Sequence, residues 1–184
     1  MYTTSSQTIG PYLHIGMTWL VEESLARPEV EGERVSVAGR IVDGDGAPVT
    51  DAMIEIWQAN AQGRYAHPED ARDLPLDEGF SGWGRIVTDS DGRFRFHTIK
   101  PGRVPGADGG LQAPHLCITI FMRGMLKQLI TRLYFDGDAA NAQDGVLARV
   151  PPARRLTLMA RQAGDGLEWN VVLQGRDETV FFDL

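Results

Sequence analysis

The chain has 184 residues, with 18 Lys or Arg and 25 Asp or Glu, so its formal net charge at pH 7 is −7. This length suffices for one domain with a sizeable core, and the acidic balance argues against nucleic acid or an anionic membrane as the main partner. The single cysteine, Cys117, excludes an internal disulfide. With a polar N-terminus, unlike a secretory signal, and no apolar run near the roughly 18 residues of a membrane span, a soluble cytoplasmic protein is expected.

Short apolar runs rich in β-branched and aromatic residues predict a succession of strands. In chain order they fall at 35–42, 52–57, 85–88, 94–98, 115–122, 128–135, 155–159, 169–173 and 180–183. Strong turn signals separate them: DGDG at 43–46, DSDG at 89–92, KPG at 100–102 and AGDG at 163–166. A short helix is expected only within 17–27, and a second short turn near 144–150.

Many short strands joined by Gly- and Pro-rich turns predict an all-β fold, namely a prealbumin-like antiparallel β-sandwich with long loops and an N-terminal arm. No linker or internal repeat divides the chain, so 1–184 is read as one domain. Within it, 1–34 is expected to form the arm and short helix and 35–184 the sandwich. The irregular segments 60–83 and 101–113 are long enough to be functional or to contact partners.

Four segments in fixed order carry a more specific signal. They are QTIGPYLHIG at 7–16, IEIWQANAQGRYAHPED at 54–70, GWGRIVTDSDGRFRFHTIKPG at 82–102, and APHLCITI at 113–120 followed by LITRLYFDGD at 129–138. Together they resemble the intradiol ring-cleaving dioxygenases, from about residue 7 to the end of the chain. The resemblance implies cleavage of a catechol ring by O2 on a non-haem ferric ion. Two tyrosinates and two histidines hold this ion, and phenolates are hard anionic donors that favour the ferric state.

The family's iron ligands carry over only in part. The first tyrosine falls at Tyr65, whereas the second falls at Val104, which cannot bind iron. The two histidines fall at His115 and Cys117, and the family arginine that precedes them is Gln112. The resemblance therefore implies no metal site and no catalytic residue in this chain alone. A softer site built from the vestigial tyrosine, histidine and thiol is the alternative, and the thiol is otherwise a small buried hydrophobe.

This pattern resembles the non-iron α subunit of the two-chain family members, which cleave protocatechuate (3,4-dihydroxybenzoate) to 3-carboxy-cis,cis-muconate in the breakdown of aromatic compounds. It implies a homologous β subunit that holds the ferric iron, a higher αβ oligomer, and protocatechuate bound at the α/β interface. Two alternatives stay open at this point. One is an autonomous intradiol enzyme with a rearranged metal site, and the other is a prealbumin-like binding module without a catalytic role.

The resemblance also assigns substrate-binding residues to the N-terminal arm and to one strand. In the arm, Thr8, Gly10, Pro11 and Tyr12 would line the pocket of the partner. The Gly-Pro pair suits this task because it allows the backbone to approach a flat ligand closely. The alternative for this segment is a strand edge or a disordered terminus.

Arg132 is the second expected contact, as the partner of the substrate carboxylate. A guanidinium binds a planar carboxylate through two parallel hydrogen bonds, which would favour protocatechuate over plain catechol. The alternative is an ordinary strand-surface arginine that pairs with Asp136 or Asp138.

Overall fold

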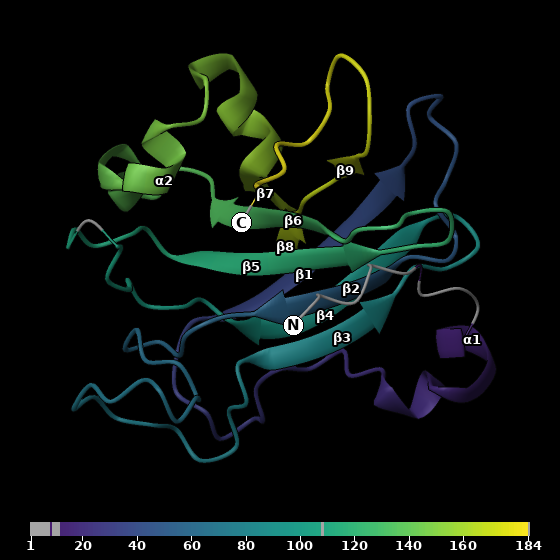
Figure 1. Ribbon diagram of the computed structural model, residues 1–184. Coiled ribbons are helices and arrows are strands. Elements are labelled where there is room, and N and C mark those ends of the chain that lie inside the picture. Colours follow the sequence, from purple (N-terminus) through teal and green to yellow (C-terminus); the bar gives the residue numbers. More distant parts are fainter. Residues whose placement is uncertain (1–7, 9–11, 108, 184) are drawn as a thin grey trace, which may run out of the picture.

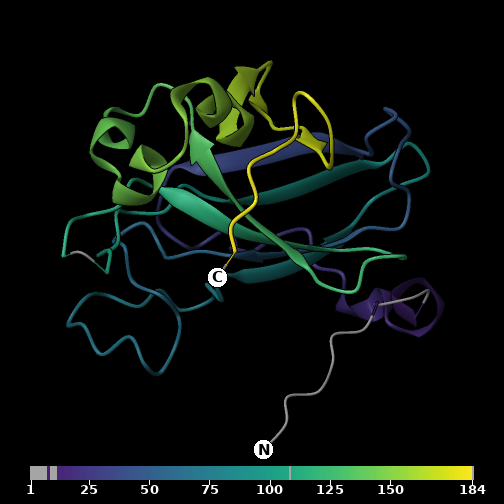
Figure 2. The same cartoon turned by 45° about the horizontal axis from the view of Figure 1, so that its top comes forward.

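The computed structural model describes residues 8, 12–107 and 109–183, apart from the side chain of residue 14. A twisted, strongly curved sheet forms the body of this region, with short helical segments at two opposite sides (Figures 1 and 2). The strands are β1 (Arg34–Val42), β2 (Met53–Trp57), β3 (Trp83–Val87), β4 (Arg93–Ile99), β5 (His115–Phe121), β6 (Leu129–Phe135), β7 (Met159–Ala163), β8 (Gly166–Glu168) and β9 (Val171–Val172). The helical segments are α1 (Tyr12–Gly16), α2 (Gly145–Ala148) and the 3-10 turns η1 (Thr18–Leu20), η2 (Ala139–Gln143) and η3 (Pro152–Leu158).

The sequence predicted an antiparallel sheet, but the sheet is mixed. Its strand order is β3-β2-β5-β6-β7-β8-β1-β4, with β9 paired to β1. Neighbours along most of this path are antiparallel, but β6–β7, β1–β8 and β1–β9 are parallel pairs. The parallel β6–β7 pair arises because the chain leaves β6, passes through η2, α2 and η3, and returns beside it in the same direction. A crossover of this kind, unlike a hairpin, produces a parallel neighbour.

An extended segment nearly closes the sheet by bridging its two edge strands. The amide of Glu22 donates to the carbonyl of Arg85 in β3 at 2.7 Å, while His97 in β4 exchanges backbone hydrogen bonds with Glu23 and Leu25. The prediction of a helix over 17–27 is therefore wrong beyond residue 20, and the α-helical turn begins earlier, at Tyr12. The unpaired edges of β3 and β4 need backbone partners, and this demand outweighs local helix preference.

The first six predicted strands are confirmed, and the C-terminal ones only in part. The interval 155–159 is almost entirely the 3-10 turn η3, and β7 begins where it ends. The interval 180–183 forms one isolated bridge to β6, and 169–173 contains only the two-residue β9. The short turn expected near 144–150 is confirmed as α2. The DGDG and DSDG turns close as expected, because Asp43 and Asp89 each accept two backbone N–H groups of their own turn.

The main core lies between the inward faces of the curved sheet. Every second residue of the long strands points into it; among the fully buried ones are Val37, Ile41, Ile54, Ile56, Phe96, Leu116, Ile118, Ile120 and Leu133. Because neighbouring strand residues point to opposite faces, the alternate residues of β2, β5 and β6 face away from this core. No helix in the described ranges is long and apolar enough to cross a membrane.

Candidate functional site

Strand register brings Cys117 and Arg132, which the sequence singled out, side by side with Trp57. Trp57 in β2 is paired with Cys117 in β5, and Cys117 is paired with Arg132 in β6. Leu116 and Ile118, the neighbours of the cysteine, are fully buried in the main core. The tryptophan, the thiol and the arginine therefore form a row on the outward face of the sheet, where β2, β5 and β6 run next to one another (Figure 1).

The loop after β2 places Tyr65 against this row. The side-chain oxygen of the buried Asn60 accepts the amides of Gln62 and Arg64, which folds the loop back tightly. The ring of Tyr65 then stacks on Trp57, with centroids 5.6 Å apart and planes within 1° of parallel. The two rings form the wall of an open pocket of about 720 Å3, which His67, Arg72 and Pro105 also line.

A carboxylate in the same loop holds the tyrosine in place. Asp70 accepts the backbone N–H of Tyr65 at 2.8 Å and forms a 2.5 Å ion pair with Arg72. The guanidinium of Arg72 also donates to the carbonyl of Gly63 at 2.7 Å. The Arg72 guanidinium beside Asp70 holds the pKa of that carboxyl well below its usual range, so the pair stays charged. Sequence reasoning did not single out this pair, whose only signal was an acid and a base two residues apart in a long loop.

Arg132 belongs to a connected polar network. Its Nη1 donates to Oε1 of Gln112 at 2.6 Å and to the hydroxyl of Tyr134 at 3.2 Å. That hydroxyl donates in turn to Oδ1 of Asp144, also at 3.2 Å. Asp144 is buried and caps α2, because it accepts the amides of the first helical residues, and its other oxygen accepts the amide of Ala113. The network thus ties the start of β5, β6 and α2 together.

The aspartates named in the alternative reading of Arg132 are paired with other residues. Asp138 forms a 2.8 Å ion pair with Lys100, and Asp136 lies 3.9 Å from Arg161. The network residues Tyr134 and Asp144 were missed in the sequence, where an aspartate two residues before an apolar pair is only a weak helix-cap signal.

His115 begins β5 next to this network and is buried, at 4% exposure. Its Nδ1 lies 2.7 Å from the carbonyl oxygen of Ala113, and its ring centroid is 5.6 Å from that of Tyr134. Burial, reinforced by the charge of Arg132, lowers the pKa of His115 to about 4. The imidazole is therefore neutral at pH 7.

The two other ionisable side chains at the vestigial ligand positions also favour their neutral forms. Burial raises the pKa of Tyr65 to about 12, and the proximity of Cys117 adds to this effect. Burial likewise raises the pKa of the Cys117 thiol, although Arg132 opposes the shift. A tyrosinate and a thiolate are thus disfavoured in this environment.

These positions do not fit a ferric ion. Val104 is buried at 3% exposure and offers no donor atom, while its carbonyl accepts the amide of Gln112. Gln112 instead holds Arg132 through its side chain. Of the four vestigial positions, Tyr65, His115 and Cys117 carry donor atoms, but the phenol and the thiol both resist ionisation. No group of three His, Cys, Asp or Glu side chains in the described part of the chain lies close enough to bind a metal.

Among the described residues expected to line a substrate pocket, Thr8 and Arg132 lie far apart. Thr8 donates its hydroxyl to the carbonyl of Met122, just after β5, while Arg132 is paired with Cys117, five residues earlier in that strand. This separation corresponds to roughly 16 Å along a strand. Tyr12 starts α1 and is 69% exposed. Gly10 and Pro11 lie outside the described residues.

Comparisons with known proteins identify the family of the chain. Residues 21–175 match the sequence profile of the family described as "Dioxygenase". The protocatechuate 3,4-dioxygenase alpha chain of Burkholderia cepacia is 42% identical, with 98% of this chain and 97% of the relative covered. The alpha chain of Pseudomonas putida is 41% identical, covering 98% and 96%, and the Burkholderia cepacia beta chain is 38% identical, covering 95% and 77%.

A solved structure shows the same fold. The dioxygenase domain of a dioxygenase carbohydrate-binding protein fusion from Streptomyces sp. SirexAA-E superposes with a TM-score of 0.62 and 27% identity, with 93% of this chain and 96% of that chain covered. The profile match spans most of the chain, and the two alpha-chain relatives exceed 40% identity over nearly all of it. The family resemblance read from the sequence is therefore confirmed, and the chain belongs to the intradiol dioxygenase family.

Proposed function

We propose that this chain is the non-iron α subunit of a protocatechuate 3,4-dioxygenase, which cleaves 3,4-dihydroxybenzoate with O2 to 3-carboxy-cis,cis-muconate. The observation that carries the proposal is the state of the four ligand positions. Val104 and Cys117 replace two of the donors, and the tyrosine that remains is held neutral by burial. The similarity of the chain to both alpha and beta chains supports a pair of homologous subunits with divided roles.

In this proposal the ferric iron and the reacting atoms belong to a homologous β subunit. The present chain supplies part of the pocket wall and the assembly interface, in a cytoplasmic αβ oligomer. Its segment 1–34 acts as an arm on the domain 35–184, a prealbumin-like sandwich. Thr8, Gly10, Pro11 and Tyr12 then line the pocket of the partner, and the exposure of Tyr12 leaves its ring available for such a contact.

Arg132 is the proposed contact for the substrate carboxylate. Its guanidinium has five N–H donors, and the bonds to Gln112 and Tyr134 both use Nη1. The remaining N–H groups are free for a carboxylate as far as the described residues extend. Because the two bonds fix the plane of the guanidinium, little side-chain entropy would be lost when an anion binds.

Metal analysis of the chain alone and in complex with its β partner tests the division of roles. The chain alone is expected to contain no iron, to lack the tyrosinate-to-iron absorption band and to leave protocatechuate intact. The co-expressed complex should gain all three properties, with about one iron per αβ pair. Stoichiometric iron and turnover in the isolated chain would instead establish an autonomous enzyme with a rearranged site. A chain that never binds a β partner would favour a binding module.

Substrate selectivity of the complex tests the role of Arg132. The Arg132→Gln substitution should lower kcat/KM for protocatechuate by about 10- to 100-fold, because a charge-assisted hydrogen bond pair is worth about 1.5–3 kcal/mol. Turnover of catechol, which has no carboxylate, should change little, and the iron content should stay the same. Lys127→Glu, an exposed change in the turn after β5, is the control. An equal loss with both substrates would assign Arg132 a purely structural role.

A further inference from the structure

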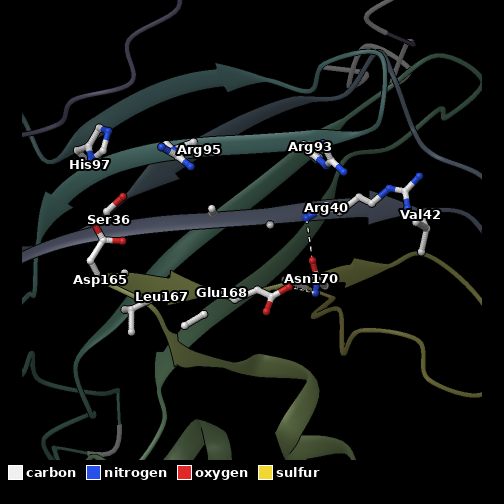
Figure 3. Close-up of a pocket in the computed structure, with 14 residues that line it drawn as sticks. Ser36, Arg40, Val42, Arg93, Arg95, His97, Asp165, Leu167, Glu168 and Asn170 are labelled. Carbon is white, nitrogen blue, oxygen red and sulfur yellow. Dashed lines mark hydrogen bonds between the residues drawn. The ribbon is translucent and has the colours of Figure 1, made fainter.

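The outer face of the sheet half formed by β4, β1 and β8 carries a groove of about 770 Å3 that the proposed function leaves unused. Figure 3 shows its layout: basic side chains stand along β4 on one side, acidic side chains lie along β8 on the other, and β1 runs between them. The floor is shallow because β1 contributes the small residues Ser36, Ala38 and Gly39. The groove is thus a flat strip with two walls of opposite charge.

The strand register gives the order of the charges along the groove. On β4, His97, Arg95 and Arg93 stand opposite Ser36, Ala38 and Arg40 of β1 in that order. On the other side, Glu168 pairs with Ala38 and therefore faces Arg95 across β1.

The two ends of the groove continue this pattern. Asp165 lies at the end that carries His97, and Asn170 lies at the end that carries Arg93 (Figure 3). From one end to the other, the opposed groups are thus histidine and aspartate, arginine and glutamate, and arginine and asparagine.

Two of these charges lack partners among the described residues, whereas Arg93 forms an exposed ion pair with Asp91 at 3.5 Å. In the described ranges, neither the guanidinium of Arg95 nor the carboxylate of Asp165 has a hydrogen-bond or ion-pair partner. Glu168 accepts only the side-chain amide of Asn170, at 3.0 Å. All of these side chains are exposed, so none of them is buried in the core of its own domain. They are available for groups of opposite charge on another molecule.

We propose that this face binds the same face of a second copy of the chain, related by a two-fold axis that runs along β1 over Ala38. Such an axis exchanges the two walls while it keeps the order along the strand. Arg95 of each copy then lies over Glu168 of the other, His97 over Asp165, and Arg93 over Asn170. An axis across the strands would place basic wall on basic wall, so the charge pattern selects one orientation.

The shape of the face agrees with this occupant. Packed sheets lie about 10 Å apart, and the small residues of β1 allow the two copies to approach while the long side chains of the walls reach across. Arg40, which lies near the axis, is turned aside because its Nε donates to the carbonyl of Asp91 at 2.7 Å. The interaction would join two αβ units through their α chains. It goes beyond the proposed function and does not depend on it.

Charge reversal with mixing tests the symmetry directly. In sedimentation equilibrium at low salt, the full chain should form dimers, and the same contact should join αβ units in the co-expressed complex. Arg95→Glu and Glu168→Arg should each weaken this association at least about tenfold, because each places like charges opposite one another twice. An equimolar mixture of the two variants should recover it, because both contacts between positions 95 and 168 in the mixed dimer are again between opposite charges.

The control and the contrary outcomes are equally specific. Lys127→Glu makes the same charge change as Arg95→Glu on another part of the surface and should leave the association intact. A wild-type chain that stays monomeric, both alone and as a single αβ unit, would overturn the inference. So would a mixture that fails to recover, or a control variant that dissociates equally. Formation of the αβ pair itself is expected to be unaffected, which separates this test from that of the proposed function.

Discussion

The buried imidazole of His115 should make the stability of the chain depend on pH in a defined window. Its pKa is about 4 in the folded chain and about 6.5 in the unfolded chain. Between these two values the unfolded chain binds a proton that the folded chain does not. The stabilisation is therefore fully present above pH 6.5 and is lost as the pH falls through 4. The difference corresponds to about 3 kcal/mol of unfolding free energy.

Urea unfolding at several pH values between 7 and 4 would measure this loss. The matched variant is His115→Asn, whose side-chain amide can still donate to the carbonyl of Ala113 but does not titrate. This variant should be less stable at pH 7, by about 1–2 kcal/mol, because the ring contact with Tyr134 is lost. Its stability should nevertheless fall much less between pH 7 and 4 than that of the wild type.

A second histidine provides the control. His67 is exposed, and His67→Asn should leave the pH dependence of the wild type unchanged. Parallel curves for wild type and His115→Asn across the whole window would refute the reasoning, since they would show that His115 titrates normally in the folded chain. The measurement stops at pH 4 because carboxylates paired in the folded state begin to protonate below it.

Three further substitutions probe the framework of the site and of the sheet. Asp70→Asn removes the carboxylate that accepts the backbone N–H of Tyr65 and pairs with Arg72, and it should lower the unfolding free energy in urea by about 2–3 kcal/mol. A loss below about 0.5 kcal/mol would contradict the role assigned to this ion pair. Gly39→Ala would place a β-carbon 1.8 Å from the carbonyl oxygen of Trp169, and it should lower the unfolding free energy by at least about 3 kcal/mol or prevent folding. The β-carbon of Gly16→Ala meets nothing within 4 Å, so this control should leave the thermal midpoint nearly unchanged. If both glycine variants melt alike, the close approach at residue 39 is incorrect. Tyr134→Phe deletes the hydroxyl that links Arg132 to Asp144, the cap of α2, and it should lower the unfolding free energy by about 1–2 kcal/mol. An unchanged urea midpoint would show that this hydroxyl does not contribute to stability.

Local sequence pattern was sufficient for the all-β class, six strands and the turns that join them. Runs such as 35–42 and 94–98 alternate or concentrate apolar residues, and the aspartates at 43 and 89 close their own turns, so short-range chemistry decides these elements. The sequence likewise predicts an incomplete ligand set, because Val104 offers no donor and Cys117 stands where the family has a histidine. That prediction rests on residue chemistry alone.

Long-range pairing decided what the sequence could not show. The segment after η1 is extended because two sheet edges require partners, and β7 lies parallel to β6 because a crossover returns the chain to its side. Neither requirement is visible in a local window. The same holds for the site and the groove. Arg132 meets Gln112 across the sheet, and the charged walls on β4 and β8 face each other only after β1 has been placed between them.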